Sequence, residues 1–185
     1  MDNFVLKKAV GLLNYGGVIA YPSEAVFGLG CDPLNESAVL RLLAIKQRPV
    51  AKGLILIASH FNQLSAYISP LDTDILAKVN NTWPGPHTWV LPASRHAPKW
   101  LMGDHEGIAV RVTAHPIAAQ LCAAFGGPLV STSANKAGRT PCKTTMQIRL
   151  RLLSAIDFVV PGEIQNHKKP TVIKNALSDE IIRSA

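Results

Sequence analysis

The stretch WPGPHTWVLPASRHAPKWLMGDHEGIAVRV, residues 83–112, decides the fold class. Two short apolar segments in it, Thr88–Leu91 and Ile108–Val112, are typical of buried strands. No helical periodicity separates them, so the connection lacks the helix that usually joins parallel strands. The sequence therefore predicts an α/β protein with a mixed sheet and helices packed on it, rather than an all-parallel doubly wound sheet.

Outside this stretch, helical and strand-like segments alternate. Asn35 is a candidate N-cap for the second helix, and Gly16-Gly17 would end the first. Turn residues are spread evenly, without a linker or a repeat, so we expect one domain over residues 1–185. Helices are predicted over Phe4–Leu13, Ser37–Ile45, Leu71–Thr82, Pro116–Phe125 and Thr144–Leu153, and further strands over Val18–Tyr21, Gly53–Ala58, Leu129–Thr132, Phe158–Val160, Thr171–Ile173 and Glu180–Ile182.

The composition is that of a globular protein, since 48% of the 185 residues are hydrophobic and 17% are charged. The net charge of +7 suits anionic partners such as nucleotides, RNA or acidic membranes, but an ordinary basic protein would also carry it. The three cysteines form no CxxC pair, which argues against a zinc site and a disulfide framework. We see no secretory leader and no apolar run long enough for a membrane span, so the expected location is the cytoplasm.

Polar residues follow the strand ending at Tyr21, in the order Tyr21-Pro22-Ser23-Glu24, and then Gly28-Leu29-Gly30 enters a loop. Ser23 and Glu24 would lie near the end of the sheet, where ligands often bind. The alternative is a plain strand-to-loop exit that Ser23 caps.

Three cations lie close together after the second helix: Lys46, Arg48 and Lys52. Pro49 should stop the helix near Arg48. The three side chains could clamp a polyphosphate, with arginine as a bidentate fork and lysine as a mobile charge. The helix dipole alone also favours cations at this end, and that reading stays open.

A hydroxyl-rich turn, Ser131-Thr132-Ser133-Ala134-Asn135, follows an apolar strand and could cradle an anion. Serine and asparagine are also common in ordinary turns. Neither the GxxxxGK[ST] phosphate loop nor the GxGxxG dinucleotide fingerprint is present. Arg111 lies inside an apolar strand, on the face opposite Val110 and Val112, and either faces solvent or binds a carboxylate.

Other residues give weaker evidence for a functional site. The six histidines, His167 among them, have neither HxxxH nor HExxH spacing, so no metal triad is predicted. Cys31 has no basic neighbour that would activate a thiol nucleophile. Trp83 and Trp89 could stack on a base, although core packing is the more ordinary role.

Five motifs in fixed order resemble the YrdC/TsaC family of threonylcarbamoyl-AMP synthases, in its short bacterial form. They are YPSEAVFGLGCDP (21–33), LLAIKQRPVAKGLILI (42–57), TWPGPHTWVLPA (82–93), GIAVRVTAHP (107–116) and PLVSTSAN (128–135). The resemblance implies a single twisted α/β sheet with a concave, positively charged cavity. It implies synthesis of threonylcarbamoyl-AMP and diphosphate from L-threonine, bicarbonate or CO₂, and ATP. Partner proteins would then transfer the threonylcarbamoyl group to adenosine 37 of tRNA.

The resemblance also assigns residues. It places the catalytic charges on Lys46, Arg48 and Lys52, and ATP on these three together with Ser133, Asn135 and Arg183. It places threonine near Ser23, Arg111, Ser131 and Thr171, and assigns no protein ligand to a metal. Ser23 stands where threonine is common in the family, and Ala25 and Ala137 stand where many members carry a hydroxyl.

The implied chemistry agrees with the polar residues, because a carboxylate attacking the α-phosphorus of ATP brings two anions together. Lys46, Arg48 and Lys52 would supply the positive charge, and Mg²⁺ would share the triphosphate. Catalysis would then be positioning and charge stabilisation, without a covalent nucleophile. The alternatives are a non-catalytic protein of this fold that binds double-stranded RNA or tRNA, and a different enzyme that forms acyl-adenylates.

Overall fold

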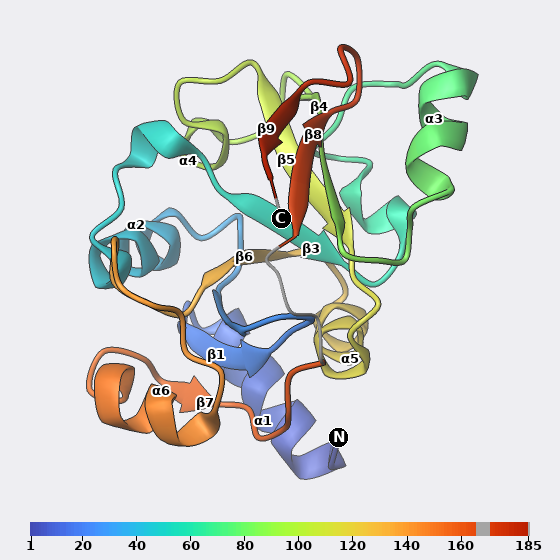
Figure 1. Cartoon of the computed structure of the whole chain (residues 1–185). Coiled ribbons are helices and arrows are strands. Elements are labelled where there is room, and N and C mark those ends of the chain that lie inside the picture. The colour runs from blue at the N-terminus through green and yellow to red at the C-terminus, as the bar shows by residue number, and fades with distance from the viewer. Residues whose placement is uncertain (166–170, 185) are drawn as a thin grey trace.

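The two strands of the 83–112 stretch, β4 (His87–Pro92) and β5 (Gly107–Val112), pair antiparallel, with Trp89 opposite Val110. They belong to one twisted mixed sheet in a computed structural model that describes residues 1–165 and 171–184 (Figure 1). Strand pairs are parallel between β1 and β7, β3 and β5, and β4 and β8, and antiparallel elsewhere. The order across the described sheet is β7 (Phe158–Val159), β1 (Ile19–Pro22), β2 (Phe27–Gly30), β6 (Leu129–Ser133), β3 (Ile55–Ala58), β5, β4, β8 (Val172–Asn175) and β9 (Ile181–Arg183).

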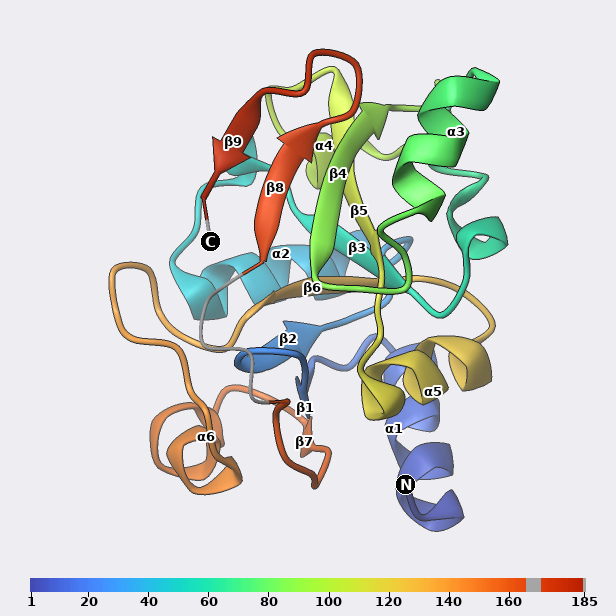
Figure 2. The same ribbon diagram turned by 45° about the vertical axis from the view of Figure 1, so that its right-hand side comes forward.

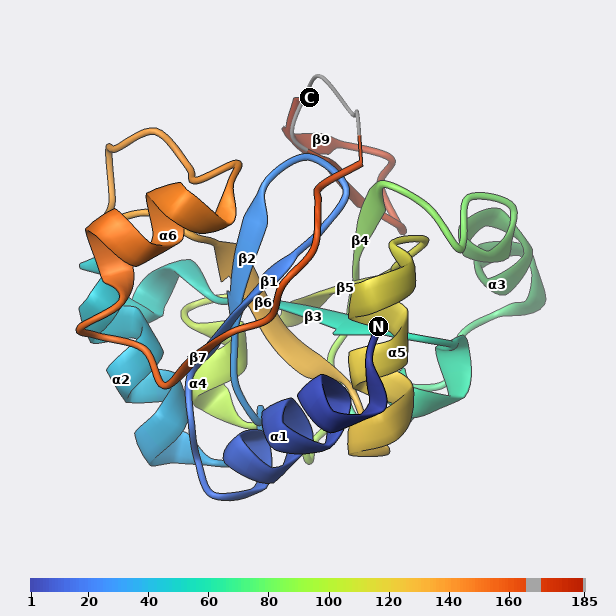
Figure 3. The same cartoon turned by 90° about the horizontal axis from the view of Figure 1, so that it is seen from below.

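Six helices flank the sheet in the described residues: α1 (Asn3–Asn14), α2 (Glu36–Lys46), α3 (Thr73–Asn80), α4 (Lys99–Met102), α5 (Pro116–Phe125) and α6 (Thr145–Leu152). Short 3₁₀ turns cover Val50–Lys52 and Phe61–Leu64. Helices α1 and α5 lie against each other, as the view from below shows (Figure 3). Helix α3 lies beside β4 at the other end of the molecule (Figure 2). None of the described helices is long and apolar enough to cross a membrane.

The predicted mixed sheet is confirmed, and so are the five predicted helices, with ends that differ by one or two residues. Asn35 is the N-cap of α2, where its side-chain oxygen accepts a hydrogen bond from the Ala38 amide at 3.0 Å. Two of the predicted strands are shorter than expected, since β3 begins at Ile55 and not at Gly53, and β7 ends at Val159 and not at Val160.

Two expectations were wrong. The segment Phe27–Gly30 is strand β2 and not a loop, because it pairs with β1 on one side and β6 on the other. The connection between β4 and β5 does contain a helix, the single turn α4 (Lys99–Met102). One turn is too short to show helical periodicity in the sequence. It also leaves β4 and β5 as antiparallel neighbours, so the mixed-sheet conclusion stands.

The sheet separates two apolar clusters. On the first face, alternate residues such as Leu56, Val110 and Val130 join a core with α2 and other elements. On the second face, Ile57 and Leu129 join a smaller core with α1 and α5. This second core covers only part of its face, and the rest of that face is left for polar side chains.

The Tyr21 ring packs against strand β2 on this second face. It is fully buried and lies directly over the two glycines of β2. A Cβ atom on Gly28 would lie 3.0 Å from Tyr21 Cζ, and one on Gly30 would lie 2.8 Å from Tyr21 Cε1 and 2.6 Å from the Val130 carbonyl oxygen. The glycines in a strand therefore mark the close approach of an aromatic ring, as such glycines often do.

We predict that Gly30→Ala lowers the free energy of unfolding by roughly 1–3 kcal/mol, because the added methyl must displace the Tyr21 ring or strand β6. Chemical denaturation followed by circular dichroism measures this change. Gly11→Ala is the matched control, since its methyl would have no neighbour within 4 Å on helix α1. That variant should be up to about 1 kcal/mol more stable than wild type. Equal effects of the two substitutions would contradict the packing argument.

Candidate functional site

A cavity of about 830 Å³ opens on the second face of the sheet, beyond the edge of the α1 and α5 core. The strand register explains which residues form its floor. Ile55 pairs with Ser131 on β6 and with Ala109 on β5, and all three line the cavity. The walls are the β1–β2 turn, the segment after α2, the turn after β6, and strands β8 and β9. Segments from across the whole chain therefore meet in one cavity.

Lys46 joins the end of α2 to the turn after β6. The side chain is 4% exposed, and its ammonium donates to the backbone oxygens of Ser133 and Asn135, with Nζ 2.9 Å from the latter. It also donates to Asn135 Oδ1 at 3.0 Å and approaches Ser133 Oγ at 3.3 Å. The Lys46 carbonyl accepts from the Ala137 amide at 2.7 Å. The lysine thus fixes the turn as well as placing a charge beside it.

The surroundings of Lys46 disfavour its positive charge. Burial first, and then the neighbouring Arg48, lower the pKa of Lys46 from 10.5 to about 8. Four oxygens around a group with three donors oppose this lowering, because they favour the protonated form. At pH 7 the ammonium form prevails, so the cavity keeps this positive charge.

Arg48 and Lys52 lie on the segment after α2. The helix ends at Lys46, two residues before Arg48 and so close to the predicted stop, and Gln47 after it adopts a left-handed conformation with a φ of 52°. The Arg48 guanidinium donates to the carbonyl oxygens of Lys52 and Gly53 at 3.1 and 3.0 Å, which holds it against the 3₁₀ turn. The Lys52 side chain is exposed and lines the cavity. Arg48 is therefore held by backbone contacts, whereas the Lys52 side chain makes no hydrogen bond within the described residues.

Ser133 and Asn135 meet the cations at the same place. Ser133 Oγ donates to Asn135 Oδ1 at 2.6 Å, and the Asn135 amide donates to the carbonyl oxygens of Lys136 and Arg139. The structure thus brings the predicted residues Lys46, Ser133 and Asn135 into one hydrogen-bonded cluster. Their role towards a nucleotide stays a prediction.

Arg111 lies on β5, 6% exposed, and its face is the one predicted by alternation, since Val110 and Val112 enter the core. It does not face solvent but lines the cavity. Its partner is Glu24, with 3.5 Å between Nη2 and Oε2. Burial acts to raise the pKa of the Glu24 carboxyl, but Arg111 and a hydrogen bond from Thr113 outweigh it and hold this pKa below its usual value.

The other residues predicted to bind the substrate threonine line the same cavity as Arg111. Ser131 Oγ is 2.8 Å from the Tyr21 hydroxyl that donates to it, so Tyr21 orients Ser131. Ser23 uses its hydroxyl proton inside the β1–β2 turn, where Oγ donates to the Val26 carbonyl at 2.6 Å, and only its oxygen remains to accept. Thr171 accepts from Arg183 through its carbonyl at 2.9 Å and its hydroxyl at 3.3 Å. All of these residues line the cavity except Tyr21.

The cavity has more cations than the described carboxylates neutralise. Arg183 has a pKa lowered by burial first and then by repulsion from Arg111 and Arg48, so these guanidinium groups share one region. Among residues 1–165 and 171–184, ion pairs form only at Arg41–Asp157, Lys78–Asp179 and Arg111–Glu24. Within that part of the chain, Lys46, Arg48, Lys52 and Arg183 have no carboxylate partner, which is the electrostatic character of an anion site.

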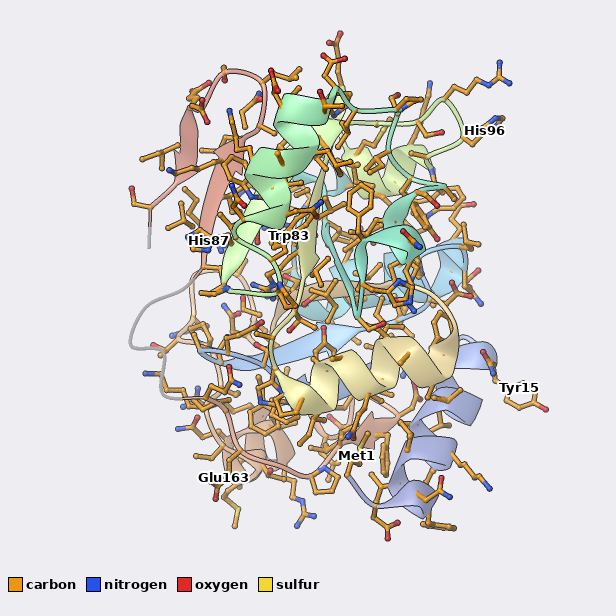
Figure 4. All side chains as sticks on the ribbon, turned by 90° about the vertical axis from the view of Figure 1, so that its right-hand side faces the viewer. Met1, Tyr15, Trp83, His87, His96 and Glu163 are labelled. Atoms are coloured by element: carbon orange, nitrogen blue, oxygen red, sulfur yellow. The ribbon has the colours of Figure 1, made fainter. Side chains whose placement is uncertain are left out.

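The tryptophans and the cysteine considered for other roles do not line the cavity. Trp83 and Trp89 are 9% and 4% exposed and belong to the core, where the Trp83 indole donates to the His87 carbonyl at 2.7 Å (Figure 4). Burial raises the pKa of the Cys31 thiol to about 12, so it is not a ready nucleophile. In the described residues no group of three His, Cys, Asp or Glu side chains could hold a metal ion, and His167 lies outside those residues.

Three neighbours of the predicted site were not assigned a role from the sequence: Glu24, Tyr21 and Thr113. Each contacts another side chain of this region: Glu24 pairs with Arg111, Thr113 donates to Glu24, and Tyr21 donates to Ser131. The only signal in the sequence is that Tyr21 and Glu24 belong to the same polar run as Ser23. Thr113 gives no signal of its own, because its relation to Glu24 depends on the tertiary fold.

The fold and the cavity define an α/β protein with a basic site that can hold anionic ligands. The chain belongs to the Sua5/YciO/YrdC family, whose model, described as "telomere recombination", matches residues 11–185. It is 51% identical over 183 residues to a threonylcarbamoyl-AMP synthase of Xanthomonas oryzae pv. oryzae, covering 96% of each chain. It is 50% identical over 180 residues to that of Halorhodospira halophila, covering 97% of this chain and 94% of the relative.

Solved structures show the same architecture. Sua5 of P. abyssi complexed with L-threonine superimposes with a TM-score of 0.92 at 27% identity, over 99% of this chain and 54% of that one. The chain therefore spans about half the length of that Sua5 protein. E. coli YciO superimposes with a TM-score of 0.87 at 28% identity, over 99% of this chain and 90% of that one. The twisted sheet with flanking helices is thus a fold of this family.

We predict that Lys46→Met lowers the free energy of unfolding by roughly 2–4 kcal/mol, because two backbone oxygens of the 133–135 turn lose their donor. Denaturant unfolding measures the loss, and faster amide exchange at Ala137 would locate it. Lys136→Met is the matched control, an exposed lysine on the same turn. Its effect should stay within about 0.5 kcal/mol. A Lys46→Met protein as stable as this control would rule out the structural role of the lysine.

Proposed function

We propose that this protein is a threonylcarbamoyl-AMP synthase, which converts L-threonine, bicarbonate or CO₂, and ATP to threonylcarbamoyl-AMP and diphosphate. The observation that carries the proposal is the meeting of two clusters in one cavity. Arg111, Ser131 and Ser23 suit a small amino acid, and the cations around Lys46 suit a triphosphate. The names of the curated relatives and the threonine in the Sua5 complex support the same reading.

In this proposal the nucleotide lies along the cations. Arg48 and Lys52 bind the phosphates directly, since Arg48 is held by its backbone contacts and the Lys52 side chain makes no hydrogen bond within the described residues. Ser133 and Asn135 present a hydroxyl and an amide turn, and Lys46 keeps that turn in shape. Arg183 approaches from β9 and adds charge from the opposite wall. Magnesium would be carried by the triphosphate, because the described residues offer no ligand cluster of their own.

The reaction needs positioning more than covalent help. The threonine ammonium first loses a proton to solvent, and the neutral amine then adds to CO₂ and releases a second proton to give a carbamate. A carbamate oxygen then attacks the α-phosphorus. A new O–P bond forms as the bond to the diphosphate oxygen breaks, and diphosphate leaves with the negative charge. Arg48, Lys52 and Lys46 stabilise that charge, and Arg111 holds the threonine carboxylate so that the carbamate faces the phosphate. The concave site also shields the unstable carbamate from water.

In this proposal the protein acts in the cytoplasm as a nucleotidyltransferase, and its product would pass to partner proteins that modify tRNA. Direct binding of tRNA or double-stranded RNA to the basic cavity is the competing function, since the cations without carboxylate partners would also suit a phosphate backbone. Such binding would need charge alone. Synthesis needs Arg111 and the Ser133–Asn135 turn as well.

We predict that wild-type protein releases diphosphate from ATP only when threonine and bicarbonate are both present, with threonylcarbamoyl-AMP detected by mass spectrometry. Arg48→Ala and Ser133→Ala should each lower kcat/KM by at least about 100-fold, because each removes a group from the phosphate side of the cavity. Arg95→Ala, an exposed arginine on the loop after β4, is the matched control and should retain activity.

Circular dichroism of each variant shows that the fold is intact. Absence of threonine-dependent diphosphate release from the wild type would end the enzyme proposal. RNA binding that falls steeply with salt, without ATP turnover, would support the competing function.

A further inference from the structure

Glu24 has one carboxylate oxygen that the described protein does not use. Its side chain is 1% exposed in the β1–β2 turn and lines the cavity. Oε1 accepts a hydrogen bond of 2.6 Å from the Thr113 hydroxyl, which in turn accepts from the His115 amide at 3.2 Å. Oε2 has no hydrogen-bond partner in the described part of the chain. Buried polar atoms are nearly always satisfied, so this oxygen needs an explanation.

The pairing with Arg111 does not provide one. A carboxylate that serves only to neutralise arginine usually accepts two parallel hydrogen bonds from the guanidinium. Here Thr113 occupies one oxygen, and the other is 3.5 Å from Arg111 Nη2, a separation at which no hydrogen bond forms in this geometry. Arg111 Nε is also without a partner among the described residues. A buried acceptor and a buried donor, close together, are therefore both left open beside the cavity.

A ligand that satisfies both groups carries an anion and a hydrogen-bond donor close to each other. An α-amino acid does so, because its carboxylate and its amino group are attached to the same carbon atom. The side-chain charges of the pair, one negative and one positive, are complementary to such a ligand in sign. A simple carboxylate would satisfy Arg111 but leave Glu24 Oε2 without a donor.

We propose that Glu24 is the residue that recognises the amino group of the amino-acid substrate, by accepting a hydrogen bond at Oε2 while Arg111 holds the carboxylate. The proposal rests on the proposed function and adds a specificity-determining residue to it. Thr113 is a positioning residue, because its hydroxyl fixes the Glu24 carboxylate from the side away from the cavity. The Glu24–Arg111 pair thus selects an α-amino acid over a carboxylic acid that lacks the amino group.

Glu24 also orients the substrate after its carboxylation. When the amine becomes a carbamate, the substrate gains a second negative charge, and the Glu24 carboxylate repels it. The cations lie elsewhere in the cavity, on Lys46, Arg48 and Lys52. Repulsion at Glu24 and attraction at these cations both turn the carbamate towards the phosphate side. Glu24 accordingly binds the amine before carboxylation and orients the carbamate after it.

Calorimetry without ATP tests the proposal on the wild-type protein. The two probes are L-threonine and 3-hydroxybutanoate with the matching configuration at its hydroxyl carbon, which lacks only the amino group. Threonine should bind at least about 10-fold more tightly, since a hydrogen bond to a charged group is of that size. Equal affinity for the two probes would overturn the proposal, even if the wild type still makes threonylcarbamoyl-AMP.

The variant Glu24→Gln separates recognition of the amine from support of Arg111. It should lower the affinity for threonine by about 10-fold to 100-fold and leave the affinity for 3-hydroxybutanoate unchanged or higher. Equal weakening of both probes would mean that Glu24 acts only through Arg111, against the proposal. Glu36→Gln makes the same change at an exposed position on α2 and should alter neither affinity. A wild type that binds neither probe would instead remove threonine from the proposed function.

Discussion

The ammonium of Lys46 ties the C-terminal end of α2 to the turn after β6, and the side of the cavity proposed to bind phosphates depends on this contact. The helix and the strand are far apart in the sequence, and a buried lysine is an expensive way to join them. Its four oxygen neighbours make the burial tolerable. A methionine would fill the space but leave the backbone oxygens of Ser133 and Asn135 without donors. The contact therefore serves the shape of the turn and the charge of the cavity together.

The second half of the site is built by strand register rather than by a loop. Alternation on β5 puts Val110 and Val112 into the core and turns Arg111 to the other face. On β6 the same alternation separates Val130 from Ser131. Because β3 lies between β5 and β6, the polar residues of both strands lie on one face with only Ile55 and Ile57 between them. Strand β5 thus contributes Arg111 to the cavity, and β6 contributes Ser131 beside it.

Much of this could be predicted from the sequence because it depends on local patterns. Apolar periodicity located every described helix except the single turn α4 and every described strand except β2, and Asn35 marked the start of α2. The pattern did not find β2, because FGLG has the small residues of a turn and only the ring of Tyr21 explains them. It could place Lys46 near a helix end, but not show that its donors point into the protein. Burial and the partners of a side chain are tertiary properties.

Ala25 and Ala137, where the resemblance led us to expect a hydroxyl, illustrate the same difference between side-chain and backbone contacts. Ala137 links to α2 through its backbone amide, which donates to the Lys46 carbonyl at 2.7 Å. Any residue other than proline can make that bond, so the missing hydroxyl does not disturb the turn. Ala25 is 7% exposed in the β1–β2 turn, whose geometry is held by Ser23 through its amide and hydroxyl contacts to Val26. In both places the backbone carries the structure, and a side chain can change while the cavity keeps its shape.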